Sequence, residues 1–197
     1  MKALHLFALL LTGLPLSAGA IDLTPHYISH MTEGVVVRRP YFADGGKKYG
    51  IKLDPETKLT ASEGGAIFRF EKFPEATTRL RSSSVPAQTG FGPETFELYR
   101  QAALLLLPAG ATAAEIIGNE ADAYPINGWS SLRLTFSYRI GNFVRRQSIT
   151  FLNLKPTEQI VIQTAASESN FDEVTARTFN IIRRWHEIVP EEEQPYS

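Results

Sequence analysis

Three arginines and one serine form the most site-like set of side chains in this sequence. Arg133 and Arg139 lie in a segment, 131–140, where apolar and polar residues alternate, and Arg146 lies in the segment that follows. Ser137 is expected directly across from Arg146. Guanidinium groups hold carboxylates and phosphates through forked hydrogen bonds, and a hydroxyl can add another donor. We therefore predict a surface that could bind an anionic small ligand or a partner protein.

This surface requires a β-hairpin between residues 131 and 154. Strict alternation of apolar and polar residues is typical of a half-buried strand. Gly141 and Asn142 both tolerate positive φ and therefore suit a two-residue hairpin loop. Such a loop would set Leu134 opposite Ile149 and leave the arginines on the face opposite the apolar side chains. A loop longer by one residue would turn the arginine of the second strand to the other face.

The alternative interpretation, an ordinary polar sheet face, is the one that we favour for these arginines. In that case they would pair with carboxylates supplied by Glu115, Glu120 or Asp122. The same register places Arg145 and Gln147 on the apolar face, where they must reach its edge or find hydrogen-bond partners.

No catalytic, cofactor-binding or metal-binding residue is predicted. A serine triad needs a base beside the nucleophile, and after residue 20 the histidines are His26, His30 and His186. No Gly-x-Ser-x-Gly motif surrounds a serine. His26 and His30 could bind a metal ion from one helical turn, but no third ligand has a convincing spacing. His186 is interpreted as a cap of the last helix.

Two other motifs have structural interpretations. The run Gly-Gly-Lys-Lys at 45–48 lacks the spacing and the following helix of a phosphate loop, so it predicts a turn with two solvated lysines. Trp129 could serve as a platform for a ligand, but a tryptophan that opens a strand is more often packed in the core or at its rim.

Residues 1–20 have the order of a secretory signal peptide. Lys2 precedes an apolar run, and Ala18 and Ala20 supply the small residues that signal peptidase requires. Cleavage after Ala20 would leave a periplasmic or secreted protein with no integral membrane segment. The alternative is a retained anchor helix, although the apolar run is too short to span a bilayer. The rest of the chain predicts one globular domain, 21–189, and an acidic flexible tail, 190–197.

The charge balance argues against a dedicated nucleic-acid-binding protein. Without Lys2 the chain has 19 basic and 21 acidic side chains, whereas nucleic-acid binders normally have a clear basic excess. The chain has no cysteine, so no disulfide could support the fold in an oxidising compartment.

The expected fold is α+β, with a single antiparallel β-sheet flanked by helices. Residues 21–34 show few periodic signals and are expected to pack loosely. Strands are predicted over 35–37, 49–53, 65–72, 77–82, 115–124, the hairpin 131–154 and 159–165.

Two helices are predicted, over 93–107 and 170–188. Pro93 suits the first position of the earlier helix, and Asn170 and Glu173 could form a capping box at the start of the later one. We expect the last helix to be docked on the sheet by three buried side chains, Phe171, Ile181 and Trp185. The sheet in question is the one that contains Leu134, Phe136 and Ile149.

The run from Phe96 to Trp185 resembles the PsbP/DcrB-like superfamily. The residues that support the resemblance are Ile126-Asn127-Gly128-Trp129, Tyr138, Gln147, the run Ile160 to Ala165, Phe171 and Phe179-Asn180-Ile181-Ile182. Many relatives end this helix with a serine and an aromatic residue, where this chain has Arg184-Trp185. The resemblance implies an α/β/α sandwich. Its members include photosystem II extrinsic proteins, bacterial envelope proteins and a Ran-binding nuclear import factor, and no metal-binding or Ran-binding residue can be transferred to this chain.

These features predict an exported, non-enzymatic accessory or binding protein of the bacterial cell envelope, without a cofactor. Its expected partner is an envelope protein or an anionic small ligand. Two alternatives stay open: a secreted hydrolase whose site is assembled from scattered residues, and an assembly factor with a protein partner.

Overall fold

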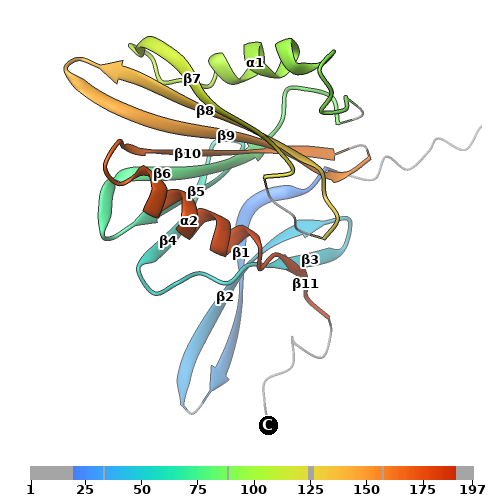
Figure 1. Cartoon of the computed structure of the whole chain (residues 1–197). Helices are drawn as coiled ribbons and strands as arrows, with labels where there is room; N and C mark the ends of the chain where they lie inside the picture. Colours follow the sequence, from blue (N-terminus) through green and yellow to red (C-terminus); the bar gives the residue numbers. More distant parts are fainter. Residues whose placement is uncertain (1–19, 33, 88, 124–126, 157, 190–197) are drawn as a thin grey trace, which may run out of the picture.

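The computed structural model describes residues 20–32, 34–87, 89–123, 127–156 and 158–189, and its strands form two antiparallel sheets (Figure 1). The larger sheet has seven strands in the order β4-β5-β6-β10-β9-β8-β7. In that order the strands are β4 (Thr57–Ser62), β5 (Gly65–Phe70), β6 (Phe73–Ser82), β10 (Glu158–Ser167), β9 (Phe143–Lys155), β8 (Ser131–Ile140) and β7 (Thr112–Ala121). The smaller sheet consists, in order, of β1 (Asp22–Thr32), β2 (Val35–Asp44), β3 (Lys47–Gly50) and β11 (His186–Glu187).

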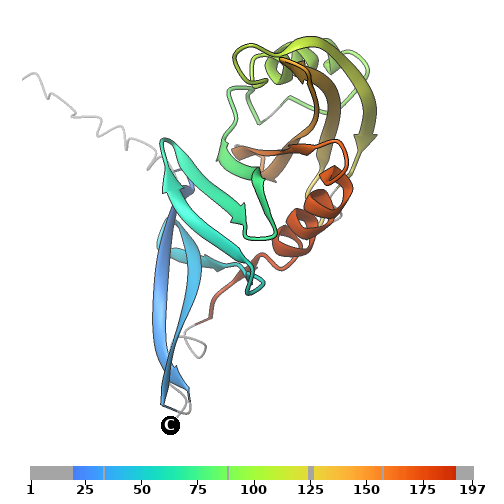
Figure 2. The ribbon, with the colours of Figure 1, turned by 90° about the vertical axis from the view of Figure 1, so that its left-hand side faces the viewer.

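The prediction of a single sheet flanked by helices is wrong. The described residues form two sheets and only two helices, α1 (Phe96–Leu104) and α2 (Phe171–Ile182). The second sheet arises because Asp22–Thr32, within the segment that we expected to pack loosely, form β1 and pair with β2. This β1–β2 hairpin extends away from the large sheet (Figure 2). Backbone pairing with a neighbouring strand satisfies the amides of a segment whose own sequence shows no clear alternation.

A hydrophobic core lies on each face of the large sheet. On one face α1 packs through Tyr99, which is fully buried with its ring 4.8 Å from that of Phe151. On the other face α2 and the small sheet enclose the larger core. There the rings of Phe42 and Trp185 lie 5.1 Å apart, so the small sheet is joined to the end of α2.

The predicted hairpin is confirmed in loop length and in register. Gly141 and Asn142 form the loop, and Leu134 pairs with Ile149 as expected. Gly141 has a φ of 59°, and a positive φ at the first loop position is what a type II′ turn requires. The hairpin therefore separates its two faces as the alternation in the sequence predicted.

The last helix is docked by the predicted side chains. Phe171, Ile181 and Trp185 are all buried. They pack on the face of the large sheet opposite the one where Leu134 and Phe136 are buried, because these two groups belong to separate cores. The helix thus lies on the expected sheet but on its other side.

The ends of α2 differ from the prediction. The helix ends at Ile182 rather than at 188, because the chain then turns and His186 pairs with Gly50 to add β11 to the small sheet. Asn170 makes no side-chain capping bond. Its amide Nδ2 instead donates to Glu75 Oε1 at 2.9 Å, so the predicted capping box is wrong.

The predicted signal peptide, apart from Ala20, and the predicted tail 190–197 lie outside the described residues. Within the described part of the chain, no helix has both the length and the apolar character needed to cross a bilayer.

Candidate functional site

The predicted arginine surface lies on the α2 face of the large sheet. Arg133 and Arg146 both line a groove between α2 and strands β7 to β9, beside Phe171 and Phe179. Ser137 and Arg146 lie opposite each other on β8 and β9, as predicted. The hairpin register therefore brings these residues to one face.

Carboxylates neutralise two of the three predicted arginines. Arg133 Nη2 donates to the carboxylate of Glu120, which lies directly across on β7. Arg146 Nη2 donates to Glu168 Oε1 at 2.8 Å, just after β10. Arg139 is exposed near the hairpin loop. The pairing with Glu120 is the alternative foreseen from the sequence, so an anion binding here would compete with carboxylates already in place.

A second group of arginines, not singled out from the sequence, lies on the α1 face. Arg79 and Arg81 of β6 and Arg145 of β9 line a hollow of about 500 Å³, together with Gln147 and Gln163. We call this hollow the arginine basin. Among the described residues that line it, none has an acidic side chain.

Strand alternation determines where the β6 arginines point. Ala76, Thr78 and Leu80 are buried, and Thr78 shares a hydrogen bond of 2.7 Å with Thr178 of α2. These residues face α2, so the intervening Arg79 and Arg81 face the opposite side of the sheet.

Gln147 of β9 and Gln163 of β10 bind the chain at the point where α1 no longer covers the sheet. Gln147 Nε2 and Gln163 Nε2 donate to the backbone oxygen of Leu106, at 3.1 and 2.8 Å. α1 ends at Leu104, so these bonds fix the chain just beyond the helix. Gln163 lies directly opposite Arg79, and the basin is the part of the face that the helix does not reach.

The basin has an uncompensated positive charge within the described chain. Neither Arg79 nor Arg81 forms an ion pair with a carboxylate of the described residues. The pKa of Arg81 is lowered from its ordinary value, first because burial penalises the charged form and then because Arg79 repels it.

Arg145, at one end of the basin, is partly engaged. Its Nη2 donates to the backbone oxygen of Glu75 at 2.9 Å. The Glu75 carboxylate accepts bonds from Asn170 at 2.9 Å and from Ser167 at 3.2 Å. The bond from Asn170 is the main reason that the pKa of Glu75 is lowered. The positive charge of Arg145 also lowers the pKa of this carboxylate, so the charge partner of Glu75 in the basin is Arg145.

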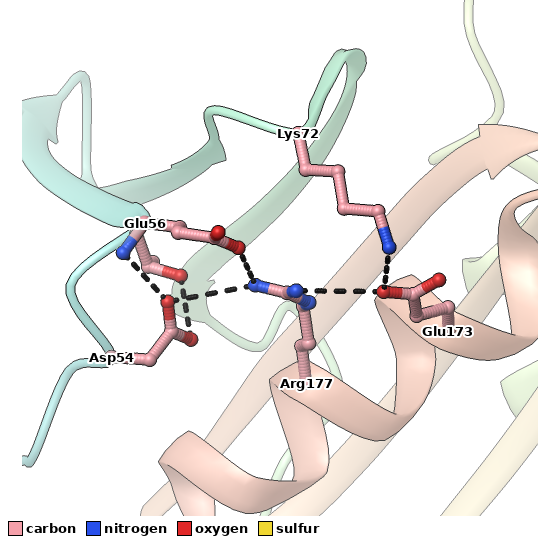
Figure 3. A network of polar contacts seen from close by, with 6 residues as sticks. Asp54, Glu56, Lys72, Glu173 and Arg177 are labelled. Atoms are coloured by element: carbon pink, nitrogen blue, oxygen red, sulfur yellow. Dashed lines mark hydrogen bonds and ion pairs between the residues drawn. The ribbon is translucent and has the colours of Figure 1, made fainter.

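Arg177 on α2, unlike Arg79 and Arg81, is surrounded by carboxylates (Figure 3). Its Nη1 lies 2.8 Å from Glu56 and 3.6 Å from Asp54, and its Nη2 lies 3.4 Å from Glu173. Lys72 contacts Glu173 as well, at 2.9 Å. The bond to Glu56 is the largest cause of the raised pKa of Arg177. This network connects α2 to the segment before β4 and leaves Arg177 with a structural role.

The histidines make local contacts. His26 Nε2 lies 2.9 Å from the carboxylate of Asp22. His186 lies in β11 rather than at a helix end, with Nδ1 2.9 Å from the backbone oxygen of Arg184, so its predicted capping role is wrong. The side chain of His30 lies outside the described residues. In the described ranges, no three His, Cys, Asp or Glu side chains are placed to hold a metal ion.

The two other motifs are largely structural, as predicted. Gly45 and Gly46 form the turn between β2 and β3 with φ of 53° and 91°. Lys47 is not merely solvated, because its Nζ lies 2.9 Å from Glu187. Trp129 packs edge-on against Trp185, with ring centroids 6.2 Å apart.

Only part of the arginine basin could have been predicted from the sequence. Thr77, Arg79 and Arg81 alternate within the predicted strand 77–82, so their shared face could be inferred. That β10 with Gln163, rather than an acidic strand, lies beside them depends on the strand order, which no local pattern reveals.

No family model matches this chain, and no curated protein matches it. Among solved structures, the chain is similar to cyanobacterial PsbP from Synechocystis, with 16% identity, a TM-score of 0.49, and coverage of 71% of this chain and 86% of that one. It is also similar to a Pseudomonas aeruginosa protein of unknown function, with 10% identity, a TM-score of 0.39, and coverage of 84% of this chain and 97% of that one. The argument about function rests on the chain's own residues.

Proposed function

We propose that this protein is a non-catalytic accessory protein that recognises a carboxylate or phosphate group through the arginine basin. One observation supports the proposal above all others. Arg79 and Arg81 line a hollow in which none of the described lining side chains is acidic. On the other face of the same sheet, Arg133 and Arg146 are paired with carboxylates.

The chemistry of the basin suits binding. Arg81 is partly buried and has no carboxylate partner among the described residues, so no ion pair offsets its desolvation cost, whereas Arg79 is exposed. An anion would offset it through charge-assisted, forked hydrogen bonds. The polar side chains around Arg79 and Arg81 are amides, hydroxyls and a third guanidinium, which act mainly as hydrogen-bond donors to an anion.

The site can be tested by titrating isotope-labelled protein with inorganic phosphate and, separately, with acetate. We expect the guanidinium N–H signals of Arg79 and Arg81 to shift in NMR spectra, and the shifts to weaken with salt. Replacing both residues (Arg79→Gln with Arg81→Gln) should weaken binding at least about ten-fold, since a hydrogen bond to a charged group contributes roughly 1.5–3 kcal/mol.

The matched control removes the same charge from the α2 face, through Arg133→Gln with Arg139→Gln. This control should bind the anions as the unchanged protein does. If the anions shift the signals of Arg133 and Arg146 instead, the site is the surface predicted from the sequence. Turnover of generic ester, phosphate or glycoside substrates that one substitution abolishes would contradict the non-catalytic part of the proposal.

The location is a separate part of the proposal. Residues 1–20 have the order of a signal peptide, and we place the mature protein in the periplasm or outside the cell, as an accessory protein of the envelope. Mass spectrometry of the protein exported by its host should give an N-terminus at Ile21. Recovery of the full chain from the membrane would contradict export.

A further inference from the structure

Three exposed apolar side chains surround the arginine basin. Leu105 is 85% exposed, Phe143 76% and Ile140 39%, and all three line the hollow. Leu105 directly follows α1, whereas Ile140 and Phe143 pair with each other on either side of the Gly141-Asn142 loop. We call these three side chains the apolar rim.

The rim is notable because of where its members lie. Single exposed apolar residues are normal on a protein surface. Here two segments that are distant in the sequence place large apolar side chains around the same hollow, which also contains Arg79 and Arg81. Clustered exposed apolar groups mark interaction sites, and aromatic and arginine side chains together are typical of the residues that dominate protein interfaces.

We infer that the occupant of the arginine basin is an acidic segment of a partner protein that also has large apolar side chains. This inference rests on the proposed function, because the carboxylates of the segment would bind Arg79 and Arg81. Its apolar side chains would cover Leu105 and Phe143. The positive charge of the basin therefore favours a segment with acidic side chains, and the apolar rim favours a segment that also has large apolar side chains.

The geometry favours a chain segment over a small ion. A small ligand that fits a pocket is usually enclosed over most of its surface. An ion held by Arg79 and Arg81 would leave Leu105 and Phe143 in water, since both stand largely exposed at the edge of the hollow. A longer occupant can fill the hollow and cover the rim at once.

The geometry also favours a chain segment over a membrane surface. Gln147 is buried and Gln163 is half-buried, and both bind the backbone of Leu106 inside the hollow. A bilayer surface would meet the protruding Leu105 and Phe143 but would not enter the recess. An extended segment can place a side chain there.

The test uses two short fluorescent peptides of equal length and equal glutamate content. One has phenylalanine and leucine between the glutamates, and the other has serine in those positions. Fluorescence anisotropy with the mature protein should show the apolar peptide binding at least about ten-fold more tightly than the serine peptide. Addition of salt should weaken both.

Two variants separate the parts of the inference. Replacing the rim, through Leu105→Ser with Phe143→Ser, should lower the affinity for the apolar peptide to that for the serine peptide. Replacing Arg79 and Arg81 by glutamine should abolish the binding of both peptides. Because all four side chains are at least partly exposed, the variants should fold, and circular dichroism checks this.

The outcomes distinguish the inference from the proposed function. Equal binding of the two peptides, or binding of inorganic phosphate without binding of either peptide, would overturn the inference and leave anion recognition in place. Binding of neither phosphate, acetate nor peptide would overturn both. A dimer in analytical ultracentrifugation that Phe143→Ser dissociates, or preferential binding to phosphatidylglycerol vesicles, would replace the partner segment by a second copy or by a lipid surface.

Discussion

Arginine side chains at the two faces of the seven-stranded sheet differ in their partners. On the α2 face, Arg133, Arg146 and Arg177 each contact a carboxylate. On the α1 face, Arg79 and Arg81 contact none of the described carboxylates. The residue type and the sheet are the same. What differs is the neighbouring groups. Glu120 of the adjacent strand β7 and Glu168 of the turn after β10 reach arginines of one face, whereas no described carboxylate pairs with Arg79 or Arg81 on the other.

The difference follows from the two helices and the segments beside them. α2 has 12 residues and places Glu173 beside Lys72 and Arg177, while the turn after β10 brings Glu168 to Arg146. α1 has nine residues and ends at Leu104, and the chain after it supplies the apolar run 105–108. Among the described residues, this short helix and the apolar segment after it bring no carboxylate to Arg79 or Arg81.

The largest expected effect comes from a substitution in the hydrophobic core on the α2 face. Trp185→Ala should lower the free energy of unfolding by about 3–5 kcal/mol, because it empties a buried site between Phe42 and Trp129. Denaturant melts measure this. Leu105→Ala is the control on the α1 face, and since Leu105 is 85% exposed it should change stability by less than about 0.5 kcal/mol. A loss below about 1 kcal/mol for Trp185→Ala would mean that this core is not closed as described.

A smaller loss of stability is expected when the hydrogen bonds that attach α1 are removed. The hydroxyl of Tyr99 donates to the backbone oxygen of Thr89 at 2.7 Å and accepts from Gln159 Nε2 at 3.1 Å. Tyr99→Phe keeps the ring but leaves both groups without this partner, so it should cost about 1–2 kcal/mol in denaturant melts. Leu98→Ala, at an exposed position of the same helix, is the control. Unchanged stability of the Tyr99 variant would show that the helix is held by its apolar contacts alone.

The third prediction tests the comparison directly. Replacing Arg79 and Arg81 by glutamine should leave the free energy of unfolding within about 0.5 kcal/mol of the original or raise it, because no ion pair is lost and a repulsion is relieved. Replacing Arg133 and Arg146 by glutamine should lower it by about 0.2–1 kcal/mol for each pair, as for other partly exposed ion pairs. The reverse order of these two effects would refute the contrast between the faces.

The smallest expected effect is an acid sensitivity of the α2 face. The pKa of Glu173 is lowered from its ordinary value, chiefly by the hydrogen bond from Lys72. Its ionised form is therefore favoured by folding, so its contribution to stability is present above the ordinary carboxyl pKa and is lost as the pH falls through the lowered one. Glu173→Gln should flatten the decline of Tm on acidification. Parallel curves for the two proteins would mean that the Glu173 carboxylate in the network of Figure 3 contributes no measurable stability.

The sequence was sufficient where local physics decides the structure. The alternation over 131–140 and the Gly141-Asn142 loop determined the register of β8 and β9, and hence which face received Arg133 and Arg146. Phe171, Ile181 and Trp185, the three side chains predicted to dock the last helix, are likewise buried.

The rest was decided by contacts between residues far apart in the chain. β1 became a strand by pairing with β2, the chain after α2 formed β11 by pairing with β3, and Arg146 found Glu168 across a turn. The arginine basin depends on β6 lying beside β10 and on α1 ending short of both. Periodicity in a sequence fixes which side chains share a face, because it follows from backbone geometry. Whether those side chains meet a carboxylate, an apolar segment or open solvent depends on the order of strands and the reach of helices, which only the tertiary structure determines.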